Sequence, residues 1–162
     1  MNILNENAYR EVWQSLDAVS PAVGFVVTCI HLGKVLSGFG EKSQFGAFGI
    51  SADEFEALFI INETGGCRPT DVAHYSVMQP AKITRVIDKL EAKELVERAD
   101  DPGDRRASNL TLSESGRSLL QAAERAFDES TRPLLNRVGA ESISALSAAL
   151  RGILGALSEE KA

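Results

Sequence analysis

The segment from Pro80 to Lys93 constrains the fold more than any other, because a helix there sorts its side chains onto separate faces. At about 100° per residue, four basic residues share one arc of that helix: Lys82, Arg85, Lys89 and Lys93. Four apolar residues fill the neighbouring arc: Ile83, Val86, Ile87 and Leu90. Such a helix anchors one face in a core and presents a basic face, as a helix in the DNA major groove must. An ordinary solvated surface helix is the alternative that this pattern leaves open.

The segments on both sides of this helix complete the order of a winged helix-turn-helix. A short helix is predicted from Pro69 to about Tyr75, so two helices follow each other closely. After the second helix, residues 95–98 and 107–112 predict two strands joined by a turn at 101–104. Arg105 and Arg106 are expected at the tip, where adjacent arginines can enter the minor groove. A merely soluble charged turn is the alternative.

The flanking parts of the chain have a helical pattern. A short helix is predicted over residues 6–16, and Pro21 opens a second that runs towards Phe39. The glycines that follow are expected to break the chain into a loop: Gly38, Gly40, Gly46 and Gly49. Residues 51–54 form a capping-box pattern that starts the next helix, and the Gly65-Gly66 pair is expected to end it.

From Ser113 to the end the periodicity is helical, and Pro133 is expected to kink or break that stretch. A long apolar stripe follows between residues 134 and 157, more than one small protomer can bury. The predicted fold is therefore mostly α with a small β wing. It is one domain in which a winged helix-turn-helix (residues 51–116) is flanked by an all-helical dimerisation lobe (residues 1–50 and 117–162).

Composition and charge narrow the function. The 162 residues carry a net charge of −6, yet residues 68–117 hold nine basic and nine acidic residues and are neutral. Acidic flanks around a neutral middle are compatible with DNA binding if the cations share a face. Two cysteines, Cys29 and Cys67, and two histidines, His31 and His74, have no metal-ligand spacing, and no nucleophile–base pair is visible. Neither an enzyme nor a metal site is expected.

The sequence also points to a location. The longest apolar run, residues 22–30, is too short to span a bilayer, and the first residues lack a secretory signal pattern. The two cysteines suit a reducing compartment. We therefore expect a cytoplasmic protein without a membrane partner.

Several motifs in the right order make the chain recognisable. They are Pro69-Thr-Asp-Val-Ala73, Ile83-Thr-Arg-Val-Ile-Asp-Lys-Leu-Glu91, Leu95-Val-Glu-Arg98, Asp104-Arg-Arg106 and Leu110-Thr-Leu-Ser-Glu-Ser-Gly116. Over about residues 68–120 the chain resembles the MarR (multiple-antibiotic-resistance regulator) family. Two departures are that Glu94 stands where the family usually has glycine, and that the turn at residues 75–78 also lacks the usual glycine.

The resemblance implies a homodimeric, ligand-responsive repressor that binds a pseudo-palindromic site in double-stranded DNA. In that family pattern the first residues of the recognition helix read bases, the terminal helices form the dimer, and Asp104 braces the wing. The resemblance implies this set of DNA-binding residues: Thr70, Gln79, Lys82, Arg85, Lys89, Arg105 and Arg106. A winged-helix protein-interaction module that does not read DNA, and a cysteine-based redox sensor, are the alternatives.

The resemblance extends to an effector site in one subgroup, the urate-responsive and PecS-type regulators. In that subgroup a tryptophan, an aspartate and two arginines line an anion site; here Trp13, Glu56, Arg85 and Arg98 match those positions, with glutamate for aspartate and Ile83 for a serine. An aromatic plate with arginine forks suits a small, flat aromatic anion. No other cofactor is expected. In the alternative interpretation Trp13 is a core or dimer aromatic, and the two arginines hold the wing.

Overall fold

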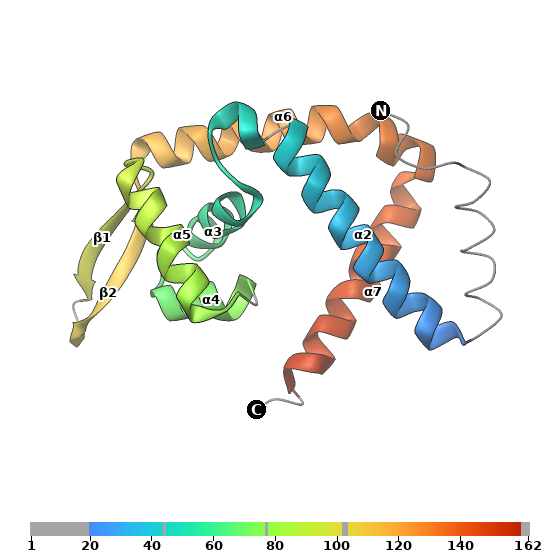
Figure 1. The fold of residues 1–162 in the computed structure, drawn as a ribbon, viewed down its shortest axis with the longest axis horizontal. Coiled ribbons are helices and arrows are strands. Elements are labelled where there is room, and N and C mark those ends of the chain that lie inside the picture. Colours follow the sequence, from blue (N-terminus) through green and yellow to red (C-terminus); the bar gives the residue numbers. More distant parts are fainter. Residues whose placement is uncertain (1–19, 44, 77, 102–103, 160–162) are drawn as a thin grey trace. The chain divides into compact units, whose positions relative to one another are not determined.

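A computed structural model describes residues 20–43, 45–76, 78–101 and 104–159. The chain is mostly helical with a two-stranded antiparallel sheet, which confirms the predicted fold class. In chain order the elements are α2 (Pro21–Ser43), the 3-10 helix η1 (Phe45–Phe48), α3 (Ala52–Glu63), α4 (Pro69–Ser76), α5 (Pro80–Ala92), β1 (Val96–Asp101), β2 (Asp104–Leu112), α6 (Glu114–Val138) and α7 (Ala140–Glu159) (Figure 1). The chain divides into two compact units, residues 1–55 and 56–162. The predicted helix at residues 6–16 lies outside the described residues.

In the first unit, α2 is longer than the sequence predicts. It continues through Gly38 and Gly40 and ends at Ser43, so the predicted loop at these glycines is wrong. Each glycine weakens a helix by only about 1 kcal/mol relative to alanine, which neighbouring turns can tolerate. The chain leaves helical geometry only around η1, where Gly49 has a φ of 67°.

The capping box predicted at the start of α3 is confirmed. The backbone N–H of Ser51 donates to the Glu54 carboxylate at 2.6 Å, and the N–H of Glu54 donates to Ser51 Oγ at 3.2 Å. These reciprocal bonds satisfy two donors that the first turn leaves without helical partners. At the other end, Gly65 (φ 68°) and Gly66 (φ 117°) end the helix as predicted.

The core of the second unit lies between the short helices and the sheet. Its fully buried side chains include Leu58, Ile61, Val72, Ile83, Ile87, Leu90, Leu110 and Leu120. Helix α4 packs on α5, and the β1–β2 hairpin, which we call the wing, contacts α5, α4 and α6. Cys67 and Leu110 exchange two backbone hydrogen bonds of 3.1 and 2.8 Å, which fastens the start of α4 to the wing.

Helix α6 continues unbroken past Pro133 to Val138, so the predicted break at this proline is wrong. Proline removes one helical hydrogen bond, but its side chain is exposed here and helical turns continue on both sides. The break falls six residues later at Gly139, whose φ of 91° is readily adopted only by glycine. There α7 turns away from α6 (Figure 1).

Helix α7 is apolar and exposed in the single chain. Leu146, Ile153, Leu154 and Leu157 are between 39 and 59% exposed. Within the described residues, the 18-residue stretch Ala140–Leu157 is the one that could cross a membrane by length and composition; its mean hydropathy is 1.2 and none of it is buried. In the sequence this stretch is not a continuous apolar run, because serines and the charged Glu141 and Arg151 interrupt it.

Candidate nucleic-acid interface

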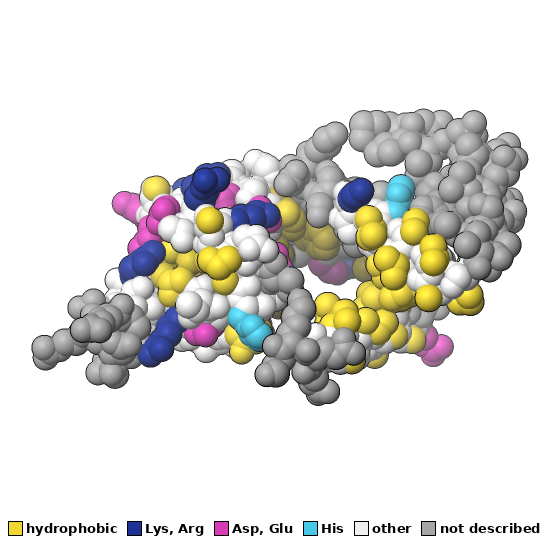
Figure 2. Space-filling model, turned by 60° about the horizontal axis from the view of Figure 1, so that its bottom comes forward, with side chains coloured by type: hydrophobic (Ala, Val, Ile, Leu, Met, Phe, Trp, Pro, Cys, Tyr) yellow, Lys and Arg dark blue, Asp and Glu magenta, His cyan; other side chains and the backbone are white. Residues whose placement is uncertain are grey.

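Helix α5 separates a buried from an exposed face, as its sequence predicts. Ile83, Val86, Ile87 and Leu90 are buried, whereas the basic arc of Lys82, Arg85, Lys89 and Lys93 is exposed. Pro80 occupies the first turn, and the exposed Gln79 precedes it as the N-cap residue. The N–H groups of the first turn of a helix favour anions. In α5 this turn follows the exposed Gln79 and contains the exposed Lys82. In Figure 2, Lys and Arg side chains form separate patches with acidic side chains among them.

Helix α4 and the turn after it hold α5 in place without the usual glycine. The N–H of Arg68 donates to Asp71 Oδ2 at 2.9 Å, which caps α4 beside the exposed Thr70. At its end, Ser76 Oγ donates to the Val72 carbonyl at 2.7 Å and accepts from the Met78 N–H at 3.4 Å. A serine side chain thus stabilises this turn, a role that the sequence analysis missed.

The wing is longer than predicted, because β2 begins at Asp104 rather than at residue 107. Asp104, Arg105 and Arg106 therefore belong to a strand, with Asp101 paired to Asp104 after a register shift. Their side chains lie outside the described residues. The bracing by Asp104 and the DNA contacts of the two arginines stay predictions.

Arg98 on β1 joins the wing to α5. Its Nε and Nη2 donate to the two carboxylate oxygens of Glu91 at 3.1 and 3.0 Å, and its Nη1 donates to Ser108 Oγ on β2 at 3.3 Å. The hydrogen bonds from Arg98 to Glu91 raise the pKa of the guanidinium above its usual value, so Arg98 keeps its positive charge. A bidentate arginine–carboxylate pair fixes orientation as well as distance.

The described residues do not test the predicted effector site as a whole. Trp13 lies outside the described residues, Glu56 is exposed on α3, and Arg98 binds Glu91. The site stays a prediction, and the position of Arg98 agrees with the alternative in which it holds the wing.

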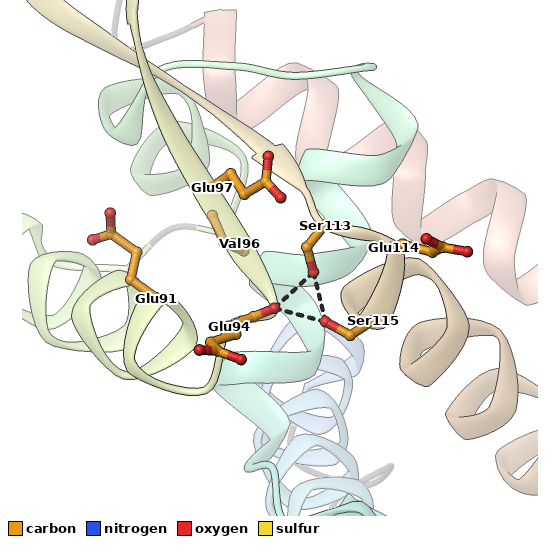
Figure 3. Close-up of a pocket in the computed structure, with 7 residues that line it drawn as sticks. All are labelled: Glu91, Glu94, Val96, Glu97, Ser113, Glu114 and Ser115. Atoms are coloured by element: carbon orange, nitrogen blue, oxygen red, sulfur yellow. Dashed lines mark hydrogen bonds between the residues drawn. The ribbon is translucent and has the colours of Figure 1, made fainter.

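A recess of about 480 Å³ lies where α5, β1 and α6 meet (Figure 3). It is open to solvent and lined by Glu91, Glu94, Val96, Glu97, Ser113, Glu114 and Ser115. Its four carboxyl groups make it unsuitable for an anion, because each would repel the ligand.

Below this recess, serine hydroxyls tie the end of α5 to the start of α6. The Glu94 carbonyl accepts hydrogen bonds from Ser113 Oγ and Ser115 Oγ, both at 2.7 Å (Figure 3). Ser113 also caps α6 by accepting from the Gly116 N–H at 2.9 Å, while its own N–H donates to the Leu95 carbonyl. We call this set the α5–α6 junction. The Ser-Glu-Ser-Gly motif was visible in the sequence, but its partner carbonyls were not.

Cysteine and metal chemistry find little support among the described residues. Cys67 is buried, and this burial raises the pKa of its thiol, which disfavours the reactive thiolate. Cys29 is half-buried on α2. Within the described ranges, no group of three or more His, Cys, Asp or Glu side chains is placed to hold a metal ion.

Comparison with known proteins gives matches of three kinds: a family model, a curated relative and solved structures. Residues 50–108 match the family model described as the MarR family. The HTH-type transcriptional repressor NicR of Pseudomonas putida is 32% identical over 73 residues, which cover 45% of this chain and 46% of NicR. The chain thus matches about half the length of this curated relative.

Two solved structures extend the similarity beyond that segment. A mutant MarR from E. coli, complexed with operator DNA, has a TM-score of 0.62 and 21% identity, covering 78% of this chain and 96% of that one. BpsR of Bordetella bronchiseptica, whose DNA binding is regulated by 6-hydroxynicotinic acid, has a TM-score of 0.56 and 26% identity, covering 64 and 79%. Residues 50–108 are therefore similar to the MarR family, and most of the chain shares the fold of a MarR protein.

Proposed function

We propose that the protein is a sequence-specific DNA-binding regulator of transcription that acts as a homodimeric repressor. The observation that carries this proposal is the exposed basic arc of α5 beside its buried apolar face. In this proposal α5 lies in the major groove, and Arg105 and Arg106 of the wing reach the adjacent minor groove. The two recognition helices of the dimer lie about one DNA turn, ~34 Å, apart.

The relatives support this function. NicR is named a transcriptional repressor, and the MarR mutant is a complex with operator DNA. The net charge of −6 is compatible with DNA binding, because residues 68–117 are neutral overall. A DNA phosphate responds to the charges near it and less to the total charge of the protein.

The apolar side chains of α7 support a two-fold assembly. Exposed leucines and isoleucines at this density are typical of a face that a partner covers. A second copy of the chain supplies an identical apolar face, so one symmetric contact covers both.

We also propose a small aromatic anion as the effector. BpsR, with 26% identity, responds to 6-hydroxynicotinic acid, which is such a compound. Trp13 provides the readout because it is the only tryptophan. Titration of the protein with 6-hydroxynicotinic acid should quench Trp13 fluorescence saturably and release DNA. If the compound does neither, this effector class is wrong for this protein.

The test of DNA binding starts with duplex fragments that the protein retains from a genomic pool. Affinity for the best fragment should fall steeply with salt. The salt slope, which is the change in the logarithm of the binding constant with the logarithm of the salt concentration, should be about −0.9 per phosphate neutralised. Arg106→Ala should reduce the slope by about 2 if each arginine neutralises a phosphate, because a dimer loses two such contacts. Lys82→Ala should also flatten the preference among sequences.

The matched control is Arg125→Ala, which removes an exposed positive charge from α6. It should leave both affinity and slope nearly unchanged. A protein that binds no duplex at low salt would instead fit a winged-helix interaction module. A protein that binds all duplexes equally would contradict the proposed sequence specificity.

A further inference from the structure

The register of the wing places Arg98 on its inner face. Val96 pairs with Leu112, and Arg98 pairs with Leu110. Because paired residues and alternate residues share a face, these four residues lie on one side of the hairpin. Val96, Leu110 and Leu112 are at most 5% exposed, so this side faces the core. Arg98 is therefore on the core-facing side of the wing, next to the buried apolar residues and at the start of its polar outer part.

At that position the arginine is already bound. Glu91 takes two of its donors and Ser108 takes a third, and the carboxylate of Asp88 adds to the negative field around it. The side chains of Arg98 and Glu91 are only 38 and 31% exposed, so solvent screens the pair incompletely. A DNA phosphate would have to displace Glu91 to bind this guanidinium.

We propose that Arg98 is a positioning residue for DNA binding, which fixes the wing against α5 through Glu91 and does not itself contact phosphate. The inference rests on the proposed function. A hairpin that extends beyond its core is flexible by itself, and the same DNA molecule must meet both α5 and the wing. Holding the hairpin before binding reduces the entropy that the complex would otherwise lose.

Substitution of Glu91 and of Arg98 distinguishes positioning from phosphate contact, because the two roles predict opposite changes in DNA affinity for Glu91→Ala. Glu91→Ala removes an acidic group near DNA, so simple electrostatics predicts tighter binding. If Arg98 positions the wing, Glu91→Ala and Arg98→Ala should each weaken specific binding by about 3- to 10-fold, and the double variant should be no weaker than either. Arg98→Lys keeps the charge but loses the bidentate fork, so it should weaken binding almost as much. None of the four should change the salt slope.

The matched control is Glu97→Ala, which removes the same charge from the neighbouring position of β1, on the face of the wing opposite to Arg98. It should leave affinity unchanged or slightly higher. Tighter binding by Glu91→Ala, or a salt slope that falls in Arg98→Ala, would overturn the inference and make Arg98 a phosphate contact.

A second measurement does not depend on DNA. Hydrogen exchange of the β1 and β2 amides should be faster in Glu91→Ala and Arg98→Ala than in Glu97→Ala, with α6 unchanged. If the protein binds no duplex, the proposed function fails, and the exchange rates still decide whether the pair positions the wing. Equal exchange in all three variants would overturn the positioning role.

Discussion

Glu94 has a left-handed backbone, with φ at 58°, at the point where α5 ends. A side chain in this conformation costs about 1 kcal/mol or more, which is why glycine is common one residue past a helix. The two serine hydroxyls of the α5–α6 junction bind its carbonyl and help to hold the strained turn. The glutamate that stands in place of the usual glycine is thus a source of local backbone strain.

Glu94→Gly should therefore stabilise the protein. Relief of the strain, less the larger entropy of an unfolded glycine, should raise the free energy of unfolding by about 0.5 to 1 kcal/mol. Urea denaturation at one fixed protein concentration measures this change. The control, Glu97→Gly, lies in extended β1 and should destabilise instead. An unfolding midpoint for Glu94→Gly at or below that of the wild type would contradict the assignment.

The hydrogen-bond partner of a side chain could be predicted from the sequence where it lies within one turn of the same helix. The reciprocal bonds of Ser51 and Glu54 follow from a four-residue pattern, and the structure confirms both. Arg98 could not be assigned in this way. Its partner Glu91 lies on another element, and their contact depends on how β1 packs against α5.

At the scale of elements, the start of α6 is pressed against the chain that leaves α5. A Cβ added to Gly116 would lie 2.0 Å from the Leu95 carbonyl oxygen and 2.9 Å from its carbon. Both neighbours are backbone atoms held by the core and the wing, so they cannot move aside as a flexible side chain would. Only glycine allows α5, β1 and α6 to meet this closely.

Gly116→Ala should accordingly lower the free energy of unfolding by at least about 2 kcal/mol, because the three elements must separate to admit one methyl group. Thermal unfolding followed by circular dichroism checks the prediction. Ser118→Ala, at an exposed position of the same helix, is the control and should stay within about 0.5 kcal/mol of the wild type. A Gly116→Ala protein as stable as this control would show that the junction is loose.

Element boundaries were predictable where one strong signal acted alone. Pro69 and Pro80 open α4 and α5, and the Gly65-Gly66 pair ends α3, as expected. The errors came where a weak signal opposed a favourable helix. Two glycines did not end α2, and Pro133 did not end α6, since the hydrogen bonds of the surrounding turns outweigh one local defect.

For the whole molecule, the exposed apolar face of α7 has the largest consequence. Leu157→Asp should raise the dissociation constant of the dimer at least about 100-fold, because the two-fold repeats the lost burial of about 1.5 kcal/mol in each copy. Sedimentation velocity at micromolar concentration measures this shift. Ala148→Asp is the control, since it lies about opposite to Leu157 at 100° per residue.

A wild-type monomer at that concentration would contradict the two-fold assembly. The length and composition of α7 would also permit contact with a lipid bilayer, and flotation of the protein with lipid vesicles tests this alternative. The sequence predicted this apolar stripe but placed the break before it at Pro133 instead of Gly139, because glycine gives a weaker signal than proline.

An uncovered α7 also ties the persistence of the protein to its own abundance. A helix of 20 residues with none of its apolar stretch buried is marginal in water. If a second copy supplies its cover, every tenfold dilution below saturation removes about 1.4 kcal/mol of that support. Newly made or scarce chains would then present a frayed C-terminal end to proteases, while paired chains would be protected. Degradation would thus remove solitary chains first, so the amount of paired protein would fall more steeply than the total amount.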